Sequence, residues 1–240
     1  MKDGVLEVLG KAIKPREQVS VPKSKVIFVS ALSDTVLEVE LGDEGKCDEI
    51  EEPATPVEWR AVADEIAKIN PPLKILIIGG VDVGKTIFVT YLVNLLTSKG
   101  RRVIVIDEDL GQSEIGAPTT IGMALFTKPV AALSKGRRIG GFFVGKTSPS
   151  GVIHRVLIGL KTLLEEAGKF KPDYIIINTD GWIYGKEAKE LKIGIAMMLK
   201  PQMIVAIQRD IETEPIISAF TTQRWVRIVR LIAPPVIKPR

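Results

Sequence analysis

Two chemically versatile side chains are scarce in this 240-residue chain, which has one cysteine, Cys47, and one histidine, His154. A lone thiol excludes an internal disulfide, so a reducing, cytoplasmic location is the default expectation. One thiolate and one imidazole also exclude a zinc site built from such ligands. Cys47 lies in an acidic stretch, where we expect a free thiol rather than a nucleophile.

Long apolar runs are also missing. No stretch approaches the ~20 residues that cross a bilayer, and the N-terminus lacks the apolar core of a signal peptide, so no membrane partner is expected. With 33 basic and 29 acidic residues the net charge is +4, which alone identifies no partner. No acid follows Glu214, and the basic residues beyond it are compatible with a nucleic-acid substrate.

The most informative stretch is residues 75–86. Residues 75–78 are apolar and predict a buried strand, residues 79–86 fit the pattern G-x-x-x-x-G-K-[ST], and residues 87–96 predict a helix. Glycines let the backbone approach phosphates closely, and the helix adds unpaired N–H groups. A chance glycine-rich turn is the alternative, but it does not explain the strand and helix on either side. We expect nucleotide binding by Gly79, Gly80, Val81, Asp82, Val83, Gly84, Lys85 and Thr86.

Within that loop, Lys85 is expected at the β- and γ-phosphates and Thr86 at Mg²⁺. The chain contains no Asn-Lys-x-Asp stretch that would recognise guanine, which argues against a signalling GTPase.

Apolar runs without alternation, each followed by a helical pattern, predict a parallel sheet covered on both faces. The expected fold is an α/β P-loop NTPase with a mostly parallel sheet flanked by helices. Its predicted strands are 75–78, 102–106, 141–144, 173–177 and 203–207. Its predicted helices are 57–69, 87–96, 152–167 and 186–199, and residues 113–122 are expected to form a loop.

Residues 1–56 are expected to form a small β-rich N-terminal module, and residues 57–240 the P-loop domain. Three short β-like runs, 5–9, 25–29 and 36–41, are separated by glycine and proline. The module is too short to bury a core alone, so it should pack on the larger domain after it. In the helix 57–69, the buried face is expected to contain Val57, Ala61, Ile66 and Ile69.

Two carboxylates follow the predicted strand 102–106. Asp107 ends this strand, where a carboxylate can reach the metal, its water or an attacking hydroxyl. The strand 173–177 ends in Asn178 rather than in an acid, so the Mg²⁺-associated role should fall to Asp107 and Asp109. An ordinary turn residue is the alternative for Asp109.

Four motifs then occur in order: the phosphate loop with Asp82, Asp107-x-Asp-x-Gly-Gln112, Thr147-Ser-Pro-Ser-Gly151 and Asn178-Thr-Asp-Gly-Trp182. From about residue 53 to 210 the chain resembles the polynucleotide 5′-hydroxyl kinases, which include the kinase subunit of the pre-mRNA cleavage machinery, nucleolar rRNA-processing kinases and archaeal homologues. The resemblance implies transfer of the ATP γ-phosphate, with Mg²⁺, to the 5′ end of single-stranded RNA or DNA. It also implies protein partners from RNA processing. The low cysteine content suits an archaeal source.

The resemblance also implies roles for individual residues. Lys85 would stabilise the migrating phosphoryl group, and Asp107 would deprotonate or orient the 5′-hydroxyl. Asp109 and Gln112 would line the cleft. The substrate end would be clasped by Thr147, Ser148 and Pro149 and would pack on Trp182. From the residues alone, a helix cap remains open for Thr147 and Ser148, and a core role for Trp182.

Residues 232–240 resemble the approach to the family's arginine-bearing lid, of which Arg240 would be the first arginine. The rest of the lid and the C-terminal domain are expected to be absent. Two other functions therefore stay open: an ATP-binding, catalytically weak scaffold in an RNA-processing complex, and a P-loop ATPase that drives partner assembly.

Overall fold

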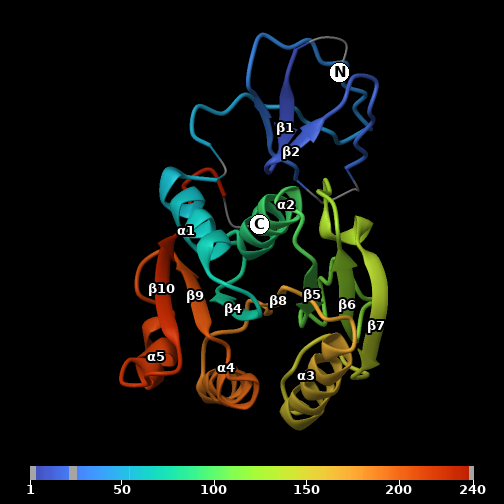
Figure 1. Ribbon diagram of the computed structural model, residues 1–240. Coiled ribbons are helices and arrows are strands. Elements are labelled where there is room, and N and C mark those ends of the chain that lie inside the picture. The colour runs from blue at the N-terminus through green and yellow to red at the C-terminus, as the bar shows by residue number, and fades with distance from the viewer. Residues whose placement is uncertain (1–3, 22–25, 54, 238–240) are drawn as a thin grey trace.

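A seven-stranded sheet lies at the centre of the computed structural model, which describes residues 4–21, 26–53 and 55–237 (Figure 1). Its order is β10-β9-β4-β8-β5-β6-β7. The five strands from β10 to β5 are parallel to one another. β6 pairs antiparallel with both of its neighbours, β5 and β7. The strands are β4 (Leu73–Gly79), β5 (Val103–Asp107), β6 (Thr120–Phe126), β7 (Arg137–Phe143), β8 (Tyr174–Asn178), β9 (Met203–Gln208) and β10 (Arg227–Ile232).

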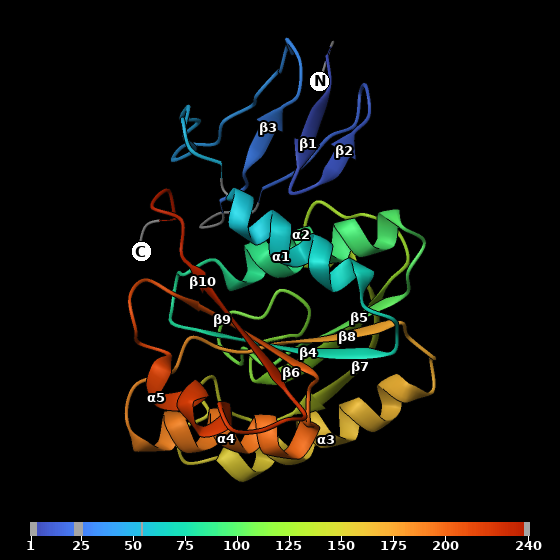
Figure 2. The ribbon, with the colours of Figure 1, turned by 60° about the vertical axis from the view of Figure 1, so that its left-hand side comes forward.

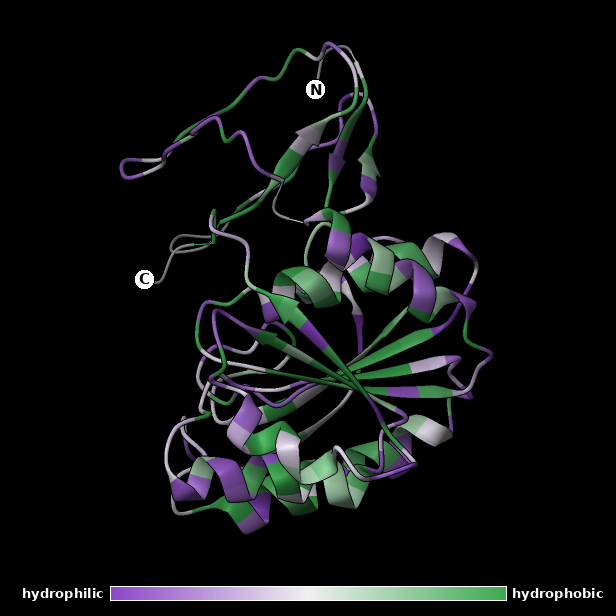
Figure 3. Ribbon diagram, turned by 90° about the vertical axis from the view of Figure 1, so that its left-hand side faces the viewer, coloured by the Kyte–Doolittle hydropathy of each residue, from purple (hydrophilic) through white to green (hydrophobic). Residues whose placement is uncertain are grey.

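Helices cover both faces of this sheet (Figure 2). On one face lie α1 (Val57–Lys68) and α2 (Lys85–Ser98), and on the other α3 (Ile153–Gly168), α4 (Lys186–Leu199) and the short α5 (Glu214–Ile217). Two 3₁₀ turns are η1 (Leu133–Lys135) and η2 (Ser218–Phe220). The central strands are apolar over most of their length because both of their faces are buried (Figure 3). The predicted α/β P-loop fold is confirmed.

In the seven-stranded sheet the sequence missed two strands and shortened a third, and it also missed the strand Lys11–Ile13 near the N-terminus. β6 begins inside the predicted loop 113–122, β7 is longer than predicted, and β10 was not predicted. β7 and β10 are the edge strands, and their exposed positions include arginines, so they lack the continuous apolar run of a central strand. In β6, Gly122 interrupts the run of apolar residues by which a buried strand is recognised. It is needed there because a Cβ at this position would lie 2.5 Å from Gly116 N.

Helix α1 buries a face that differs in part from the one predicted: Ile66 is buried and Ile69 packs on the core as expected. Val57 is 76% exposed and Ala61 is also exposed, so the prediction was wrong for both. The indole of Trp59 sets the orientation, because its ring packs edge-on against Phe88 with centroids 5.6 Å apart. Its Nε1 also donates to Ile232 O at 2.9 Å. The buried face consists of Trp59, Ala63 and Ile66.

Within the described part of residues 1–56, the N-terminal module is an antiparallel sheet of order β2-β1-β3, comprising β1 (Leu6–Val8), β2 (Lys11–Ile13) and β3 (Val29–Ala31). The predicted strand 5–9 is confirmed. Residue 25 lies outside the described residues, and β3 starts only at the end of the predicted run 25–29. The predicted strand 36–41 was wrong: Val36 makes an isolated β-bridge, no strand forms, and the apolar side chains of the run are exposed.

Asn94 of α2 joins this module to the rest of the protein. Its buried side chain donates from Nδ2 to Leu9 O and Val130 O, both at 2.9 Å, and its Oδ1 accepts from Val130 N at 2.8 Å. Next to Leu9, a Cβ on Gly10 would lie 3.2 Å from the ring of Tyr91. The module therefore packs on α2, as expected.

Replacing Asn94 by leucine should destabilise the protein by roughly 2–4 kcal/mol, because buried backbone groups of Leu9 and Val130 would lose their partners. Urea unfolding checks this, with exposed Asn70→Ala as the control that should change stability by less than about 0.5 kcal/mol. Equal stabilities of Asn94→Leu and Asn70→Ala would contradict the linking role of Asn94.

Candidate active site

The predicted phosphate loop lies at the carboxyl edge of the sheet, between the end of β4 at Gly79 and the start of α2 at Lys85. Its two patterned glycines are required by their surroundings. A Cβ on Gly79 would lie 2.4 Å from Ile207 O, and one on Gly84 would lie 2.6 Å from Ile237 Cδ1. Gly84 also has φ +95°, a conformation that side chains disfavour. The loop is therefore tightly fixed between β9 and the segment after β10.

Lys85 is held against the loop that it follows. Its side chain is buried and its Nζ donates to Gly80 O at 2.6 Å. Burial lowers the pKa of Lys85 to about 8, and repulsion from Lys192 acts in the same direction. Three carboxylates lie near enough to oppose this shift: Asp180, Asp109 and Glu108. The ammonium is thus poorly solvated and would gain an interaction partner from a phosphate.

Asp107 lies inside the protein, with 1% of its surface exposed. Its Oδ2 accepts from Ser113 Oγ at 2.8 Å and Glu114 N at 2.7 Å, and its Oδ1 accepts from Asn178 Nδ2 at 3.0 Å. Burial raises the pKa of Asp107, while these hydrogen bonds lower it. These three bonds leave one acceptor position on Oδ1, so it is the burial of Asp107 that separates its carboxylate from the metal or hydroxyl contact predicted for it.

Asp109 is half-buried and belongs to the turn after β5. Its Oδ1 accepts from Gly111 N at 3.1 Å and from Gln112 N at 2.8 Å, so this carboxylate shapes the turn. Within the described chain its Oδ2 has no hydrogen-bond partner. Its negative charge also acts on Lys85. Asp109 therefore combines the turn role with a carboxylate oxygen near the phosphate-loop lysine.

The Thr147–Gly151 motif lies against the turn of Asp109, because a Cβ on Gly111 would lie 3.1 Å from Thr147 O. Thr147 and Ser148 are exposed, and Pro149 is buried. Neither hydroxyl caps α3, whose N-cap is Val152 without a side-chain hydrogen bond, so the capping alternative was wrong.

Trp182 follows β8 and lies beside the phosphate loop. A Cβ on the preceding Gly181 would lie 2.5 Å from Val81 Cγ2, so the two turns are in close contact. Trp182 is half-buried, packs on the core between the sheet and α3 and α4, and donates from its N–H to Asp180 Oδ1 at 3.0 Å. Trp182 therefore combines the core contact left open by the sequence with partial exposure of the residue.

A model of the family described as mRNA cleavage and polyadenylation factor CLP1 P-loop matches residues 79–240. The chain belongs to this CLP1 P-loop family. Among curated proteins, a polyribonucleotide 5′-hydroxyl-kinase of Pyrococcus furiosus is 38% identical over 167 residues, 69% of this chain and 46% of that protein. A relative of the same name from Methanocaldococcus jannaschii is 37% identical over 151 residues, 62% of this chain and 41% of that protein.

The chain thus spans less than half the length of these curated relatives. Among solved structures, a chain of the wild-type Clp1p–Pcf11p complex matches with a TM-score of 0.70 at 13% identity, covering 100% of this chain and 62% of that chain. At this identity the likeness concerns the fold alone. Membership of the CLP1 P-loop family confirms the resemblance found in the four ordered motifs.

Sequence reasoning missed a buried ionic cluster of Glu108, Asp180 and Lys192 at the same edge. Lys192 Nζ lies 3.0 Å from Glu108 Oε2 and 2.5 Å from Asp180 Oδ1. A signal was present in the sequence: Lys192 occupies the apolar face of α4 between Ala188 and Ile195. A lysine at such a position requires a buried acidic partner.

Arg209, at the end of β9, was also missed. Its Nη2 donates to Asp82 O in the phosphate loop and to Ile237 O after β10, both at 2.8 Å. The segment after β10 therefore returns to the phosphate loop. Arg240, predicted as the first lid arginine, lies outside the described residues.

The oxygen donors at this edge suit a magnesium ion. Thr86 lies in the first turn of α2, and Asp109 supplies a carboxylate near Lys85. Mg²⁺ in phosphate sites takes one or two protein ligands and is otherwise held by phosphates and water. Residues 4–21, 26–53 and 55–237 contain no group of three acidic, His or Cys side chains that could hold a metal. The same residues include no helix long and apolar enough to span a bilayer.

Nucleotide-free Lys85→Met should be more stable than the wild type at pH 7, by up to about 3 kcal/mol. Below pH 8 folding buries a charged ammonium, and this unfavourable contribution disappears as the pH rises from about 8 towards the unfolded value of 10.5. The stability difference should therefore shrink over that interval in chemical denaturation. Exposed Lys99→Met is the control, and a destabilised Lys85→Met at pH 7 would contradict the burial argument.

Proposed function

We propose that the chain carries a polynucleotide 5′-hydroxyl kinase activity, transferring the γ-phosphate of ATP to the 5′-hydroxyl of single-stranded RNA. The observation that supports this most is the meeting of three turns at one sheet edge. These turns carry Lys85, Asp109 and Trp182. Gly181 lies in close contact with Val81, and the charge of Asp109 acts on Lys85. The names of the curated archaeal relatives support the same activity.

The phosphate loop and the first turn of α2 would bind the triphosphate of ATP. Residues 79–84 offer backbone N–H groups, and Lys85 would exchange its contact with Gly80 O for the β- and γ-phosphates. Thr86 would hold Mg²⁺ together with phosphate oxygens and water, and the bound ion would neutralise phosphate charge. Phosphoryl transfer depends mainly on such positioning and charge neutralisation, so few reactive side chains are needed.

We assign proton acceptance to Asp109 and a supporting role to Asp107. Asp109 Oδ2 would accept the proton of the 5′-hydroxyl while the 5′-oxygen bonds to the γ-phosphorus. The bond from the γ-phosphorus to the β–γ bridging oxygen breaks, and ADP leaves. Asp107 instead holds the strand end and the following loop through Ser113, Glu114 and Asn178.

The acceptor would lie between the Thr147–Gly151 motif and the Trp182 turn. The exposed Thr147 and Ser148 would contact the terminal nucleotide, with buried Pro149 supporting them and Gln112 lining the cleft. Trp182 is partly exposed and would offer its ring to a base, which suits sequence-tolerant single-strand binding. Partners from RNA processing and a cytoplasmic location stay predictions of the sequence.

The test is transfer of labelled γ-phosphate from Mg-ATP to a short 5′-hydroxyl RNA, with the matching DNA beside it and Lys85→Ala as the inactive control. Labelled RNA in the wild-type lane alone is the expected result. Phosphate release without an acceptor would support the ATPase alternative. ATP binding with neither transfer nor release would support the scaffold.

Asp109→Asn should lower transfer by about 10²–10⁴-fold, because the proton acceptor is lost. The asparagine Oδ1 can still accept from Gly111 N and Gln112 N, so folding and ATP affinity should be retained. Steady-state kinetics and thermal melting check this. A near wild-type rate for Asp109→Asn, with a strong loss in Asp107→Asn of intact fold, would return the base role to Asp107.

Trp182→Ala should weaken binding of single-stranded RNA by roughly 1–3 kcal/mol without changing ATP affinity. Fluorescence anisotropy of labelled RNA and calorimetry with ATP measure the two terms separately. Equal losses for both ligands would assign Trp182 to the core. Trp225→Phe is the matched control, since Trp225 is also half-buried and packs edge-on against Phe220 away from the phosphate loop.

A further inference from the structure

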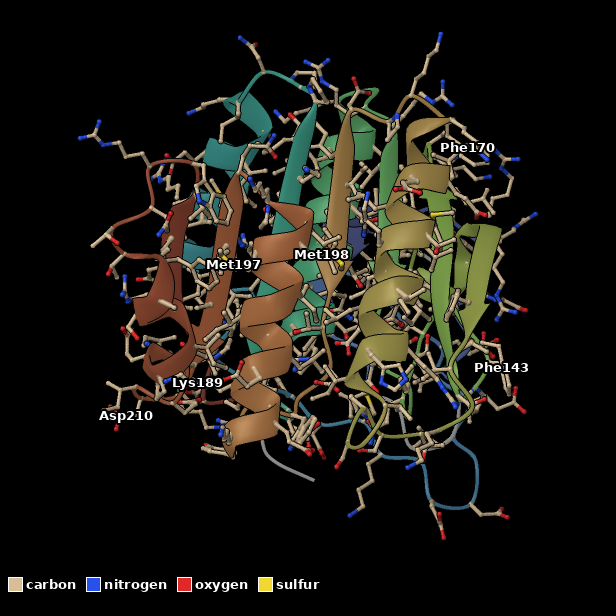
Figure 4. The ribbon with its side chains drawn as sticks, turned by 90° about the horizontal axis from the view of Figure 1, so that it is seen from below. Phe143, Phe170, Lys189, Met197, Met198 and Asp210 are labelled. Atoms are coloured by element: carbon tan, nitrogen blue, oxygen red, sulfur yellow. The ribbon has the colours of Figure 1, made fainter. Side chains whose placement is uncertain are left out.

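Three ionisable groups are enclosed between the sheet and α4, on the face opposite to α2. Glu108 and Lys192 are 0% exposed and Asp180 is 6% exposed. They come from the turn after β5, from α4 and from the turn after β8. Figure 4 shows α3 and α4 lying side by side across this face of the sheet, so the cluster is shielded from solvent.

Core stability alone does not account for this cluster. Buried ion pairs lose much of their attraction to desolvation, and apolar side chains of similar volume often replace them without loss of stability. The neighbouring α4 positions, Leu191 and Ile195, are apolar, so an apolar residue at 192 would match its surroundings. Within the described chain, Glu108 Oε1 and Asp180 Oδ2 are buried without a hydrogen-bond partner, which makes the cluster an unfavourable way to fill a core.

The cluster joins the two turns that carry the site. Glu108 precedes Asp109, donates its N–H to Asn178 O at 2.8 Å, and accepts from Asp180 N at 3.0 Å through Oε2. Asp180 in turn accepts from Trp182 N at 3.0 Å. Lys192 Nζ contacts both carboxylates. One side chain of α4 therefore fixes the acid-bearing turn and the Trp182 turn relative to each other.

We infer that Lys192 is a positioning residue for phosphoryl transfer, acting through Glu108 and Asp180 to hold Asp109 and Trp182 at the distance that the acceptor requires. This inference rests on the proposed kinase function. Its physical reason is that an in-line reaction needs both reactants fixed, and a displacement of about 1 Å can lower the rate by about 10²-fold. Buried contacts beneath the two turns meet that need.

The decisive variant replaces the whole cluster with apolar side chains, as Lys192→Met, Glu108→Met and Asp180→Ala together. None of the three charges of the cluster is left without its partner, so the protein should fold. The amides of residues 180 and 182 lose an acceptor, so its melting temperature should lie between those of Lys192→Met and the wild type. ATP affinity should stay within about twofold, because residues 79–86 are unchanged and the charges removed act on Lys85 in opposite directions. Transfer to RNA should fall about 10–100-fold in kcat/KM, as is usual when residues that orient a reactive group are removed.

The single variant Lys192→Met separates stability from positioning. It leaves two unpaired buried carboxylates and should melt at a lower temperature, and the triple variant should regain part of this stability without regaining transfer. Lys189→Met is the matched control, an exposed lysine one turn earlier on α4 (Figure 4). Recovery of wild-type transfer together with stability in the triple variant would overturn the inference and leave the cluster a purely structural role.

Hydrogen exchange keeps this test independent of the kinase proposal. Backbone amides of residues 178–185 should exchange at least about tenfold faster in the triple variant, while those of β10 should not change. If the wild type transfers no phosphate, the kinase proposal fails, and the exchange data still decide whether Lys192 fixes the two turns. Unchanged exchange at 178–185 would overturn the positioning role whatever the activity.

Discussion

Parallel pairing of β5, β8 and β4 is the constraint on which the site depends. Its register places Asp107 beside Asn178 and Asn178 beside Ile77, so the strands end at one edge. The turns after these three strands carry the phosphate loop, Asp109 and Trp182. Antiparallel pairing at β8 would send its polar turn to the opposite edge of the sheet. The proposed site therefore depends first on strand direction, which brings the three turns together, and only then on the individual side chains.

The central elements could be predicted because their signals are local. The apolar runs of β4, β5, β8 and β9 can be recognised without knowledge of their neighbours, and the glycine-rich pattern fixes the phosphate loop between β4 and α2. Edge strands such as β10 could not be found this way, because their pattern depends on which neighbour covers them. The face of α1 was wrong for a similar reason, since Trp59 finds its partners in Phe88 and in the backbone of Ile232, far along the chain.

In the site, the sequence identified the residue types better than their surroundings. The sequence predicted that Asp107 and Asp109 lie at this edge, but not that their environments differ. The hydrogen bonds that Asp107 accepts from Ser113, Glu114 and Asn178 are known only from the folded structure. The ionic cluster around Lys192 shows the same limit. A lysine on an apolar helix face indicates that a buried acidic partner exists, but only the fold identifies Glu108 and Asp180 as its partners.

The most direct measurement is a crystal structure with a non-hydrolysable ATP analogue, Mg²⁺ and a short 5′-hydroxyl RNA. The account predicts that the triphosphate lies on residues 79–86 and that the 5′-hydroxyl lies within hydrogen-bond distance of Asp109 and in line with the γ-phosphorus. The terminal nucleotide should contact Trp182. An RNA 5′ end bound away from Asp109, or a triphosphate that leaves Lys85 on Gly80 O, would contradict it.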